Sequence, residues 1–193
     1  MSASIRTDRL VLREWREADR DPWAALNADP EVMRYFPSTY DRARSDAAFT
    51  AISAQLDDRG WGLWALDHEG EFIGFTGLAI PRFTAPFTPA VEIGWRLSRD
   101  AWGHGFATEA AQSVLAYACE ELELDEVVSF TSAVNERSRR VMERIGMTHD
   151  PRDDFEHPDI EAGNPLRPHV LYRARPANAE SGLVSRIRQT LAR

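Results

Sequence analysis

The chain has 193 residues, of which 43% are hydrophobic, and its formal net charge is -8 at pH 7. This composition is typical of a globular protein and excludes a disordered one, and the length suits one α/β domain better than two. The acidic balance argues against nonspecific binding to nucleic acid. All 23 basic residues are arginine, which excludes mechanisms that need a lysine Schiff base or a lysine general base.

The sequence also indicates a cellular location. No stretch approaches the roughly 18 apolar residues that a membrane span requires. Residues 1–6 lack the apolar core of a secretory signal, and the single cysteine, Cys119, cannot form an intrachain disulfide. We therefore expect a cytoplasmic protein that has neither a membrane nor a nucleic acid as its partner.

The first half of the chain predicts a strand, then helices, then three strands. Asp21-Pro22 and Asp29-Pro30 each combine an N-cap residue with proline at the first helical position, and Asp41 caps a longer helix. The expected helices lie near 22–28, near 30–35 and after 41. The expected strands lie at 9–15, 63–66, 72–80 and 91–97, with a turn at 68–71 and a proline-rich loop at 81–89.

The second half begins with a turn at 102–107 that contains two glycines. It leads into a helix with an apolar stripe from Ala107 to Leu122. Asn135 can cap a short helix that Gly146 ends. Strands are expected at 127–131 and 169–173, a polar loop at 149–168 and a tail helix at 180–192. This order of elements predicts an α/β (α+β) domain with a mixed sheet.

The glycine turn is the main chemical signal. Gly103-x-Gly105-x-Ala107 stands between a strand and a helix, where unpaired N–H groups and the helix dipole favour a phosphate or pyrophosphate. The same pattern also occurs as a purely structural turn. There is no Gly-Lys-Ser/Thr for a P-loop, and Thr108 stands where a dinucleotide-binding fingerprint needs a small residue.

Two further runs allow a family to be identified. Glu92-Ile-Gly-Trp-Arg-Leu97 followed by Trp102-Gly-His-Gly-Phe-Ala-Thr-Glu109 resembles the acetyl-CoA-binding core of the GNAT superfamily of N-acetyltransferases. The segments 135–147 and 7–13 are similar to the flanking parts of that family. The features look most like the branch that includes bacterial ribosomal-protein N-terminal acetyltransferases. The resemblance spans residues 5–174 and leaves 175–193 as a C-terminal tail.

The resemblance implies a fold and a coenzyme site. The fold would be a mixed, mainly antiparallel central sheet, splayed in its middle and flanked by helices. Strand 92–97 would admit the pantetheine arm, the backbone amides of 102–108 would hold the pyrophosphate, and the helix start at 135–138 would lie beside the thioester. The implied coenzyme-binding residues are Trp95, Arg96, Leu97, Trp102, Gly103, His104, Gly105, Phe106, Ala107, Thr108, Asn135 and Ser138.

The implied reaction transfers acetyl from acetyl-CoA to a primary amine, either a protein N-terminus or a small amine, without a metal. A proton must leave the amine and the oxyanion needs a donor. Glu92 is the candidate base and would need a raised pKa, although it could be a simple surface residue. Relatives often carry tyrosine where Met142 stands, so Ser138 is assigned as the acid. They often carry Arg or Gln where Trp102 stands.

Several interpretations stay open at this stage. Phe83 and Phe87 could line an acceptor pocket or form a dimer contact, and a homodimer is possible by analogy. His104 could touch phosphate or face solvent, and the arginines of 137–144 could meet the 3′-phosphate of the coenzyme. The other histidines are too scattered to suggest zinc. The alternatives to an enzyme are a non-catalytic acyl-CoA-binding domain and a nucleotide-binding interaction domain.

Overall fold

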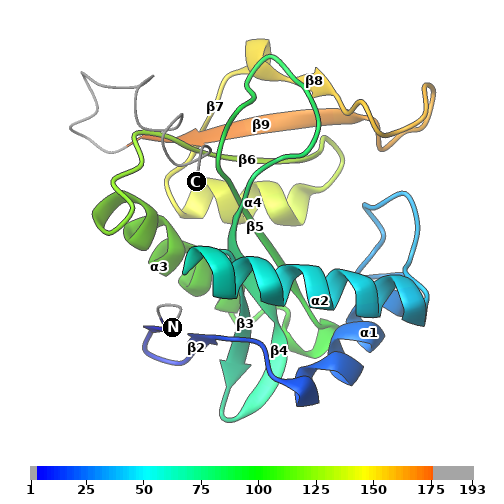
Figure 1. Ribbon diagram of the computed structural model, residues 1–193. Coiled ribbons are helices and arrows are strands. Elements are labelled where there is room, and N and C mark those ends of the chain that lie inside the picture. The colour runs from blue at the N-terminus through cyan, green and yellow to red at the C-terminus, as the bar shows by residue number, and fades with distance from the viewer. Residues whose placement is uncertain (1–3, 176–193) are drawn as a thin grey trace. The chain divides into compact units, whose positions relative to one another are not determined.

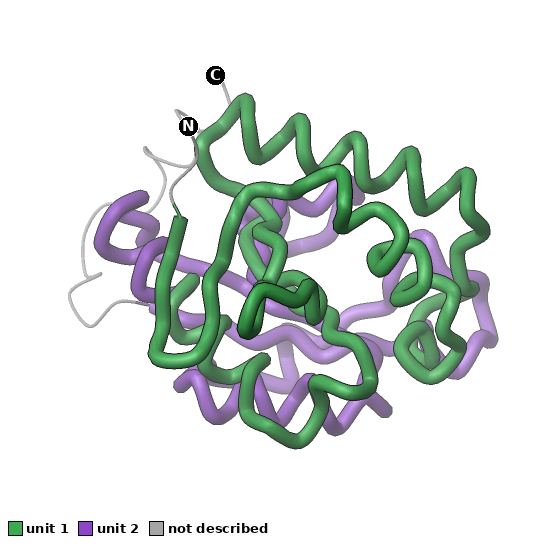
Figure 2. The backbone as a smooth tube through the Cα atoms, turned by 90° about the horizontal axis from the view of Figure 1, so that it is seen from below, with its two compact units in different colours: residues 1–78, 94–114 green, residues 79–93, 115–193 purple. Residues whose placement is uncertain are grey.

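The computed structural model describes residues 4–175 (Figure 1). Two compact units divide the chain: Met1–Leu78 with Gly94–Val114, and Ala79–Ile93 with Leu115–Arg193 (Figure 2). We call them unit 1 and unit 2. The division runs through β4, β5 and α3, and each unit is described by itself. The tail helix predicted at 180–192 lies outside the described residues.

Unit 1 contains an antiparallel sheet and two complete helices. Leu12 of β2 pairs with Leu66 of β3, and Leu66 pairs with Gly74 of β4. Positive φ angles at Glu69 and Gly70 close the β3–β4 hairpin, as the sequence predicts. The elements that lie wholly or partly in unit 1 are β1 (Ile5–Arg6), β2 (Val11–Arg13), α1 (Arg20–Ala28), α2 (Arg42–Arg59), β3 (Leu63–His68), β4 (Glu71–Ala79), β5 (Glu92–Leu97) and α3 (Phe106–Glu120), with 3-10 turns at Glu17–Asp19 and Arg99–Ala101.

The N-cap predictions have different outcomes. Asp41 caps α2 by accepting a hydrogen bond from the backbone N–H of Arg44 at 2.8 Å, which confirms the predicted start. The helix predicted at 30–35 is wrong, because this segment forms only turns. Asp29 is already the C-cap of α1, and its carboxylate accepts from the backbone N–H of Glu31 in a local turn. The backbone N–H of Met33 also donates to the Asp29 carbonyl at 3.0 Å, but this single turn does not continue into a helix.

Aromatic side chains form the core of unit 1. The ring centroids of Trp15 and Trp23 are 5.2 Å apart and those of Trp15 and Phe49 are 5.3 Å apart, both edge-to-face. The buried members of this cluster are Trp23, Leu26, Val32, Phe49 and Phe75. They join α1, α2 and β4.

Gly74 lets β4 approach β5 closely within unit 1. A Cβ atom at Gly74 would collide with the backbone carbonyl of Arg96, and its φ of 143° also favours glycine. Nearby, the Thr76 hydroxyl donates to the carbonyl of Gly94 at 2.9 Å. The strand that carries the GNAT-like run is thus held against β4 by backbone and side-chain contacts.

Unit 2 contains a second group of strands and one complete helix. Glu92 of β5 pairs with Val128 of β6 in parallel, whereas β6, β7 and β8 pair with β9 in antiparallel fashion. The sheet is therefore mixed and mainly antiparallel, as predicted. The elements are the start of β5, the end of α3, β6 (Val127–Ser132), α4 (Glu136–Arg144), β7 (Thr148–His149), a 3-10 turn (Pro151–Asp153), β8 (Phe155–Glu156) and β9 (Pro168–Ala174).

The two faces of this sheet carry different side chains. Residues paired across strands point to the same face, so Glu92, Val128 and Arg173 share one face. Thr131 and Tyr172 lie on the other face, where α4 packs. Asn135 donates to the Thr131 hydroxyl at 2.9 Å, and the Tyr172 hydroxyl donates to Glu143 at 3.0 Å.

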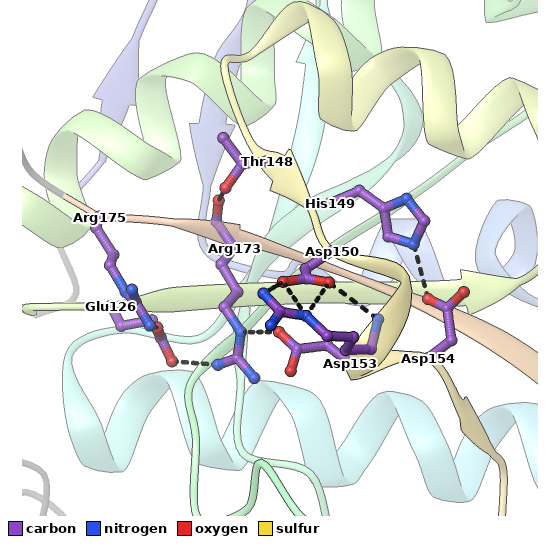
Figure 3. Close-up of polar contacts among 9 residues, drawn as sticks. Glu126, Thr148, His149, Asp150, Asp153, Asp154, Arg173 and Arg175 are labelled. Atoms are coloured by element: carbon purple, nitrogen blue, oxygen red, sulfur yellow. Dashed lines mark hydrogen bonds and ion pairs between the residues drawn. The ribbon is translucent and has the colours of Figure 1, made fainter.

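Ion pairs hold the end of β9 (Figure 3). The Arg173 guanidinium contacts Glu126 at 2.6 Å and Asp153 at 2.7 Å, and Arg175 contacts Glu126 at 2.7 Å. His149 lies 2.7 Å from Asp154 on the neighbouring segment. These contacts connect β9 to the loops before β6 and β8. The segment 149–168, predicted to be a loop, contains the end of β7 and the short strand β8.

A buried ion cluster joins β2 to β3 in unit 1. Arg13, Asp19 and Asp67 are 7%, 3% and 7% exposed. The Arg13 guanidinium contacts Asp19 at 2.7 Å and Asp67 at 2.8 Å. The hydrogen bonds that Arg13 donates to Asp19 raise the pKa of Arg13, although burial opposes this. Removal of this arginine would leave two carboxylates buried without their cation.

We therefore expect Arg13→Met to lower the free energy of unfolding by about 3–5 kcal/mol, the usual cost of breaking a buried ion pair. Urea unfolding followed by circular dichroism measures the change. The control is Arg140→Met, which removes an exposed pair with Glu136 and should cost at most about 1 kcal/mol. Equal effects of the two substitutions would contradict this assignment.

Candidate active site

The glycine turn lies in unit 1 and has the backbone geometry of a helix start. Gly103 and Gly105 have φ angles of 82° and 80°, which side-chain-bearing residues rarely adopt. A side chain at position 103 would not clash with its neighbours, because a Cβ added at Gly103 would meet nothing within 4 Å. The backbone N–H of Glu109 donates to the Gly105 carbonyl at 3.0 Å, so the first turn of α3 begins here. N–H groups of a first helical turn have no intrahelical partner.

Side chains next to the turn have mixed exposure. His104 is exposed and its ring stacks 5.5 Å from that of Phe106, which is buried. Trp102 donates its indole N–H to the Leu97 carbonyl at 2.9 Å and packs against the aromatic core of unit 1. The indole therefore has a structural role where relatives often carry Arg or Gln.

The N-terminal segment holds the turn through Glu109. This carboxylate accepts hydrogen bonds from the Thr7 hydroxyl at 2.6 Å and from Arg9 Nε at 2.7 Å. Arg9 Nη1 also donates to the carbonyl of His104 at 3.0 Å. Burial alone would raise the pKa of Glu109, but these hydrogen bonds lower it. Arg9 and Glu109 were missed as site residues, because their partnership joins positions 100 apart in the chain.

Three further predicted residues lie on β5. Leu97 is buried, whereas Trp95 and Arg96 are half-buried. Arg96 contacts the segment around α1 in unit 1, and its side chain has no carboxylate partner among the described residues.

Glu92 starts β5 in unit 2. Its side chain is half-buried, and burial raises the pKa of its carboxyl to about 8. Within residues 4–175 no group donates a hydrogen bond to it. The parallel register of β5 with β6 consists of the single pair Glu92 and Val128. At the next position the Ser129 hydroxyl donates to the Ile93 carbonyl at 2.9 Å.

Asn135 and Ser138 lie at the start of α4, as predicted. The Asn135 side chain caps α4 by accepting from the Ser138 N–H at 3.3 Å, and its amide nitrogen donates to Thr131. Ser138 is half-buried, and its hydroxyl has no hydrogen-bond partner in the part of the chain that the structure describes. Met142, one helical turn later, is 1% exposed.

Phe83 and Phe87 come together in unit 2, with ring centroids 6.2 Å apart. They extend an aromatic cluster on the face of the sheet that carries Glu92. Both rings are half-buried and pack around Phe130 at 5.5 and 5.7 Å. The other members of the cluster are Phe155, His157 and His169. Desolvation lowers the pKa of both histidines.

No group of three or more His, Cys, Asp or Glu side chains in residues 4–175 is arranged to hold a metal ion. None of the described helices has the length and apolar character to cross a membrane.

Comparison with known proteins identifies the class. The model of the acetyltransferase (GNAT) domain family matches residues 9–148. The chain therefore belongs to the GNAT family of acetyltransferases, which are acetyl-CoA-dependent acyltransferases.

Individual relatives support this assignment. The FsC-acetyl coenzyme A-N(2)-transacetylase of Aspergillus fumigatus is 35% identical over 172 residues, which cover 83% of this chain and 73% of that protein. The solved structure of an acetyltransferase from Agrobacterium tumefaciens has 30% identity and a TM-score of 0.73, covering 91% of this chain and 96% of that one.

A third comparison concerns the fold. RimL, a ribosomal L7/L12 alpha-N-protein acetyltransferase solved in complex with coenzyme A, has a TM-score of 0.72 at 16% identity. The match covers 90% of this chain and 98% of that one. The likeness confirms the predicted fold class.

The raised pKa of Glu92 has a measurable effect on stability. Its carboxyl has an ordinary pKa of 4.5 and a folded-state pKa of about 8, so the folded state retains a proton that the unfolded state releases. Stability therefore falls as the pH rises between these two values. Glu92→Gln, which cannot ionise, removes this fall.

We expect the Glu92→Gln variant and the wild type to differ least in unfolding free energy below pH 4.5. The advantage of the variant should grow up to about pH 8. Urea unfolding at a series of pH values measures this, with the exposed Glu71→Gln as a control that shows no such trend. A difference that does not depend on pH would contradict the raised pKa.

Proposed function

We propose that this protein transfers the acetyl group of acetyl-CoA directly to a primary amine within a ternary complex. The observation that carries the proposal is Glu92, a half-buried carboxyl with a pKa of about 8 in a GNAT-like run. A base with a pKa near neutrality is well suited to remove a proton from an ammonium group. The proposed catalytic domain is residues 5–174.

The coenzyme would bind to backbone groups that the fold leaves available. Residues 102–108 form a turn with two positive-φ glycines at the start of a helix, and this geometry fits a pyrophosphate. Trp95, Arg96 and Leu97 would contribute the backbone of β5 along the pantetheine arm. Exposed Arg144 could add charge for the 3′-phosphate, whereas Arg139 is engaged with Tyr172 and the Ala133 carbonyl.

Acetyl-CoA supplies an acetyl group activated as a thioester. Glu92 accepts the proton of the acceptor ammonium, directly or through water, so that the neutral amine can attack. Backbone N–H groups of β5 stabilise the charge on the acetyl oxygen. The Ser138 hydroxyl gives a proton to the departing sulfur and is reprotonated from solvent, while Asn135 fixes the start of α4.

The faces of unit 2 support this division of roles. Glu92 lies on the face that carries Phe130 and the rings of Phe83 and Phe87, so we propose that the acceptor amine binds there. Ser138 belongs to α4 on the opposite face. This assignment gives the acceptor amine and the departing thiolate separate groups for proton transfer.

The acceptors of relatives leave the choice of amine open. The name of the Aspergillus relative describes an N2-transacetylase that uses acetyl coenzyme A, and RimL is an alpha-N-protein acetyltransferase. A small amine and a protein N-terminus are both compatible with the proposed chemistry.

A non-catalytic acyl-CoA-binding role is the second candidate. Its support is Met142, which is fully buried where many GNAT enzymes carry a tyrosine. Such a protein would bind acetyl-CoA but would release no thiol with any amine.

Calorimetric titration tests the coenzyme site. We expect acetyl-CoA to bind with micromolar affinity, whereas ATP and NAD do not. Gly105→Val should abolish binding because valine is strained at a φ of 80°. Gly163→Val is the matched control, since Gly163 has a φ of 86° in unit 2 outside the proposed site and nothing within 4 Å of an added Cβ. Retained affinity in Gly105→Val would refute the assignment of the turn.

Steady-state thiol release tests the catalytic roles. We expect Glu92→Gln to lower kcat by about 10²–10⁴-fold, the usual contribution of a general base, with an unchanged Kd for acetyl-CoA. Ser138→Ala should lower kcat less, because water can also protonate a thiolate. Full activity in both variants would exclude these roles, and the absence of turnover in the wild type with a broad panel of amines would favour the second candidate.

A further inference from the structure

One peptide unit of the glycine turn in unit 1 is held from its carbonyl side. Nη1 of Arg9 donates a hydrogen bond to the His104 carbonyl at 3.0 Å. This carbonyl and the backbone N–H of Gly105 belong to the same peptide unit, which is trans. In a planar trans peptide the C=O and N–H bonds point in opposite directions. The Gly105 N–H therefore points away from Arg9.

The N–H of Gly105 is free to bind an anion. Gly103, His104 and Gly105 are all exposed, so the turn lies at the surface of unit 1. Within residues 4–175 the Gly105 N–H donates to no acceptor. An unpaired N–H just before a helix is the kind of donor that a phosphate oxygen accepts from.

Glycine by itself does not fix the direction of this N–H. The φ of Gly105 is 80°, and glycine adopts negative φ values about as readily. The peptide unit before Gly105 can therefore turn over at little steric cost. Among the described residues, apart from its chain neighbours, only Nη2 of Arg9 lies within 4 Å of a Cβ built at Gly105, at 3.6 Å. The hold on this peptide thus comes from Arg9.

Arg9 is itself fixed to the start of α3. Its Nη2 lies 2.6 Å from Glu109 Oε2, and its backbone N–H donates to Glu109 Oε1 at 3.0 Å. The guanidinium lies 4.7 Å from the ring centroid of Phe106, which is buried. The planar fork of a guanidinium can reach a carboxylate and a carbonyl at the same time, whereas an ammonium is a point charge. Arg9 therefore ties the first turn of α3 to the peptide just before it.

We propose that Arg9 is a positioning residue that holds the peptide between His104 and Gly105 so that the Gly105 N–H donates to the pyrophosphate of the coenzyme. This inference rests on the proposed function, which places the pyrophosphate at residues 102–108. The cation beside the carbonyl also polarises the peptide and strengthens its N–H as a donor. Because Arg9 acts through the backbone of the turn, it controls coenzyme affinity, and its loss should appear in the KM for acetyl-CoA and not in kcat.

Calorimetry with CoA and dephospho-CoA tests this role, because the two share the pyrophosphate and differ in the 3′-phosphate. We expect Arg9→Met to raise both Kd values by the same factor, about tenfold or more, as one hydrogen bond to a charged group implies. Arg42→Met is the matched control, since Arg42 is an exposed arginine of unit 1 that pairs with Asp21 and Asp46. It should keep the wild-type Kd. Unchanged Kd values in Arg9→Met, or a loss confined to CoA, overturn the proposal.

Two further variants separate position from charge, once circular dichroism has shown that each is folded. Arg9→Lys keeps a charge beside Glu109 but cannot also hold the His104 carbonyl, so its Kd values should rise as in Arg9→Met. Glu109→Gln leaves the charge of Arg9 unneutralised but holds it less firmly, so we expect weaker binding. Wild-type affinity in Arg9→Lys, or tighter binding in Glu109→Gln, would show that only the charge matters and would overturn the proposal.

A measurement on the wild type reports the Gly105 N–H directly. His104-Gly105 is the only His-Gly pair in the sequence, so carbonyl-¹³C histidine with ¹⁵N glycine marks this one peptide in an NMR spectrum. We expect CoA and dephospho-CoA to move its amide proton downfield, as a hydrogen bond to an anionic oxygen implies. An amide signal that neither coenzyme moves, or no binding of either, overturns the proposal. Binding with this shift but without acetylation of any amine contradicts only the proposed function.

Discussion

The cost of burying a charge is the constraint on which the functional interpretation of this fold depends. The strand β5 carries both a carboxyl, Glu92, and a guanidinium, Arg96, and neither has an oppositely charged partner among the described residues. Stable cores avoid this, and unit 1 itself neutralises Arg13 with two carboxylates. Groups that reduce stability in this way are expected where ligands bind, because substrate supplies the missing proton or charge.

The second requirement is a fixed backbone at the start of α3. The two glycines allow this backbone conformation, but they also raise the entropic cost of fixing it. Glycine loses more conformational freedom on folding than any other residue. The structure compensates with Glu109, which binds Thr7 and the backbone and side chain of Arg9, and with the bond from Arg9 to the His104 carbonyl. The opening segment of the chain therefore keeps the N–H groups of the turn in place. This long-range anchor explains how a glycine-rich sequence can form an ordered turn.

Local chemistry made much of the fold predictable. The cap at Asp41, the cap at Asn135 and the turn before β4 all depend on residues within a few positions of each other. The helix expected at 30–35 is absent: Asp29 ends α1, and the segment after it forms only turns. The aromatic cluster around Phe130 and the surroundings of Arg96 join segments far apart in the chain. The motif could identify Glu92, but only the folded chain gives the burial that raises its pKa.

The replacement of tyrosine by Met142 does not by itself remove a route for the proton. Met142 is fully buried, so it fills the core beside α4 and leaves the helix packing intact. Ser138 lies one turn earlier on α4, and its hydroxyl is not committed to another described group. A thiolate is a far better leaving group than an alkoxide, because the pKa of a thiol is only about 8.5. In the proposed reaction, acid assistance therefore contributes less than removal of the amine proton, so the proposed roles of Glu92 and Ser138 do not require a tyrosine at Met142.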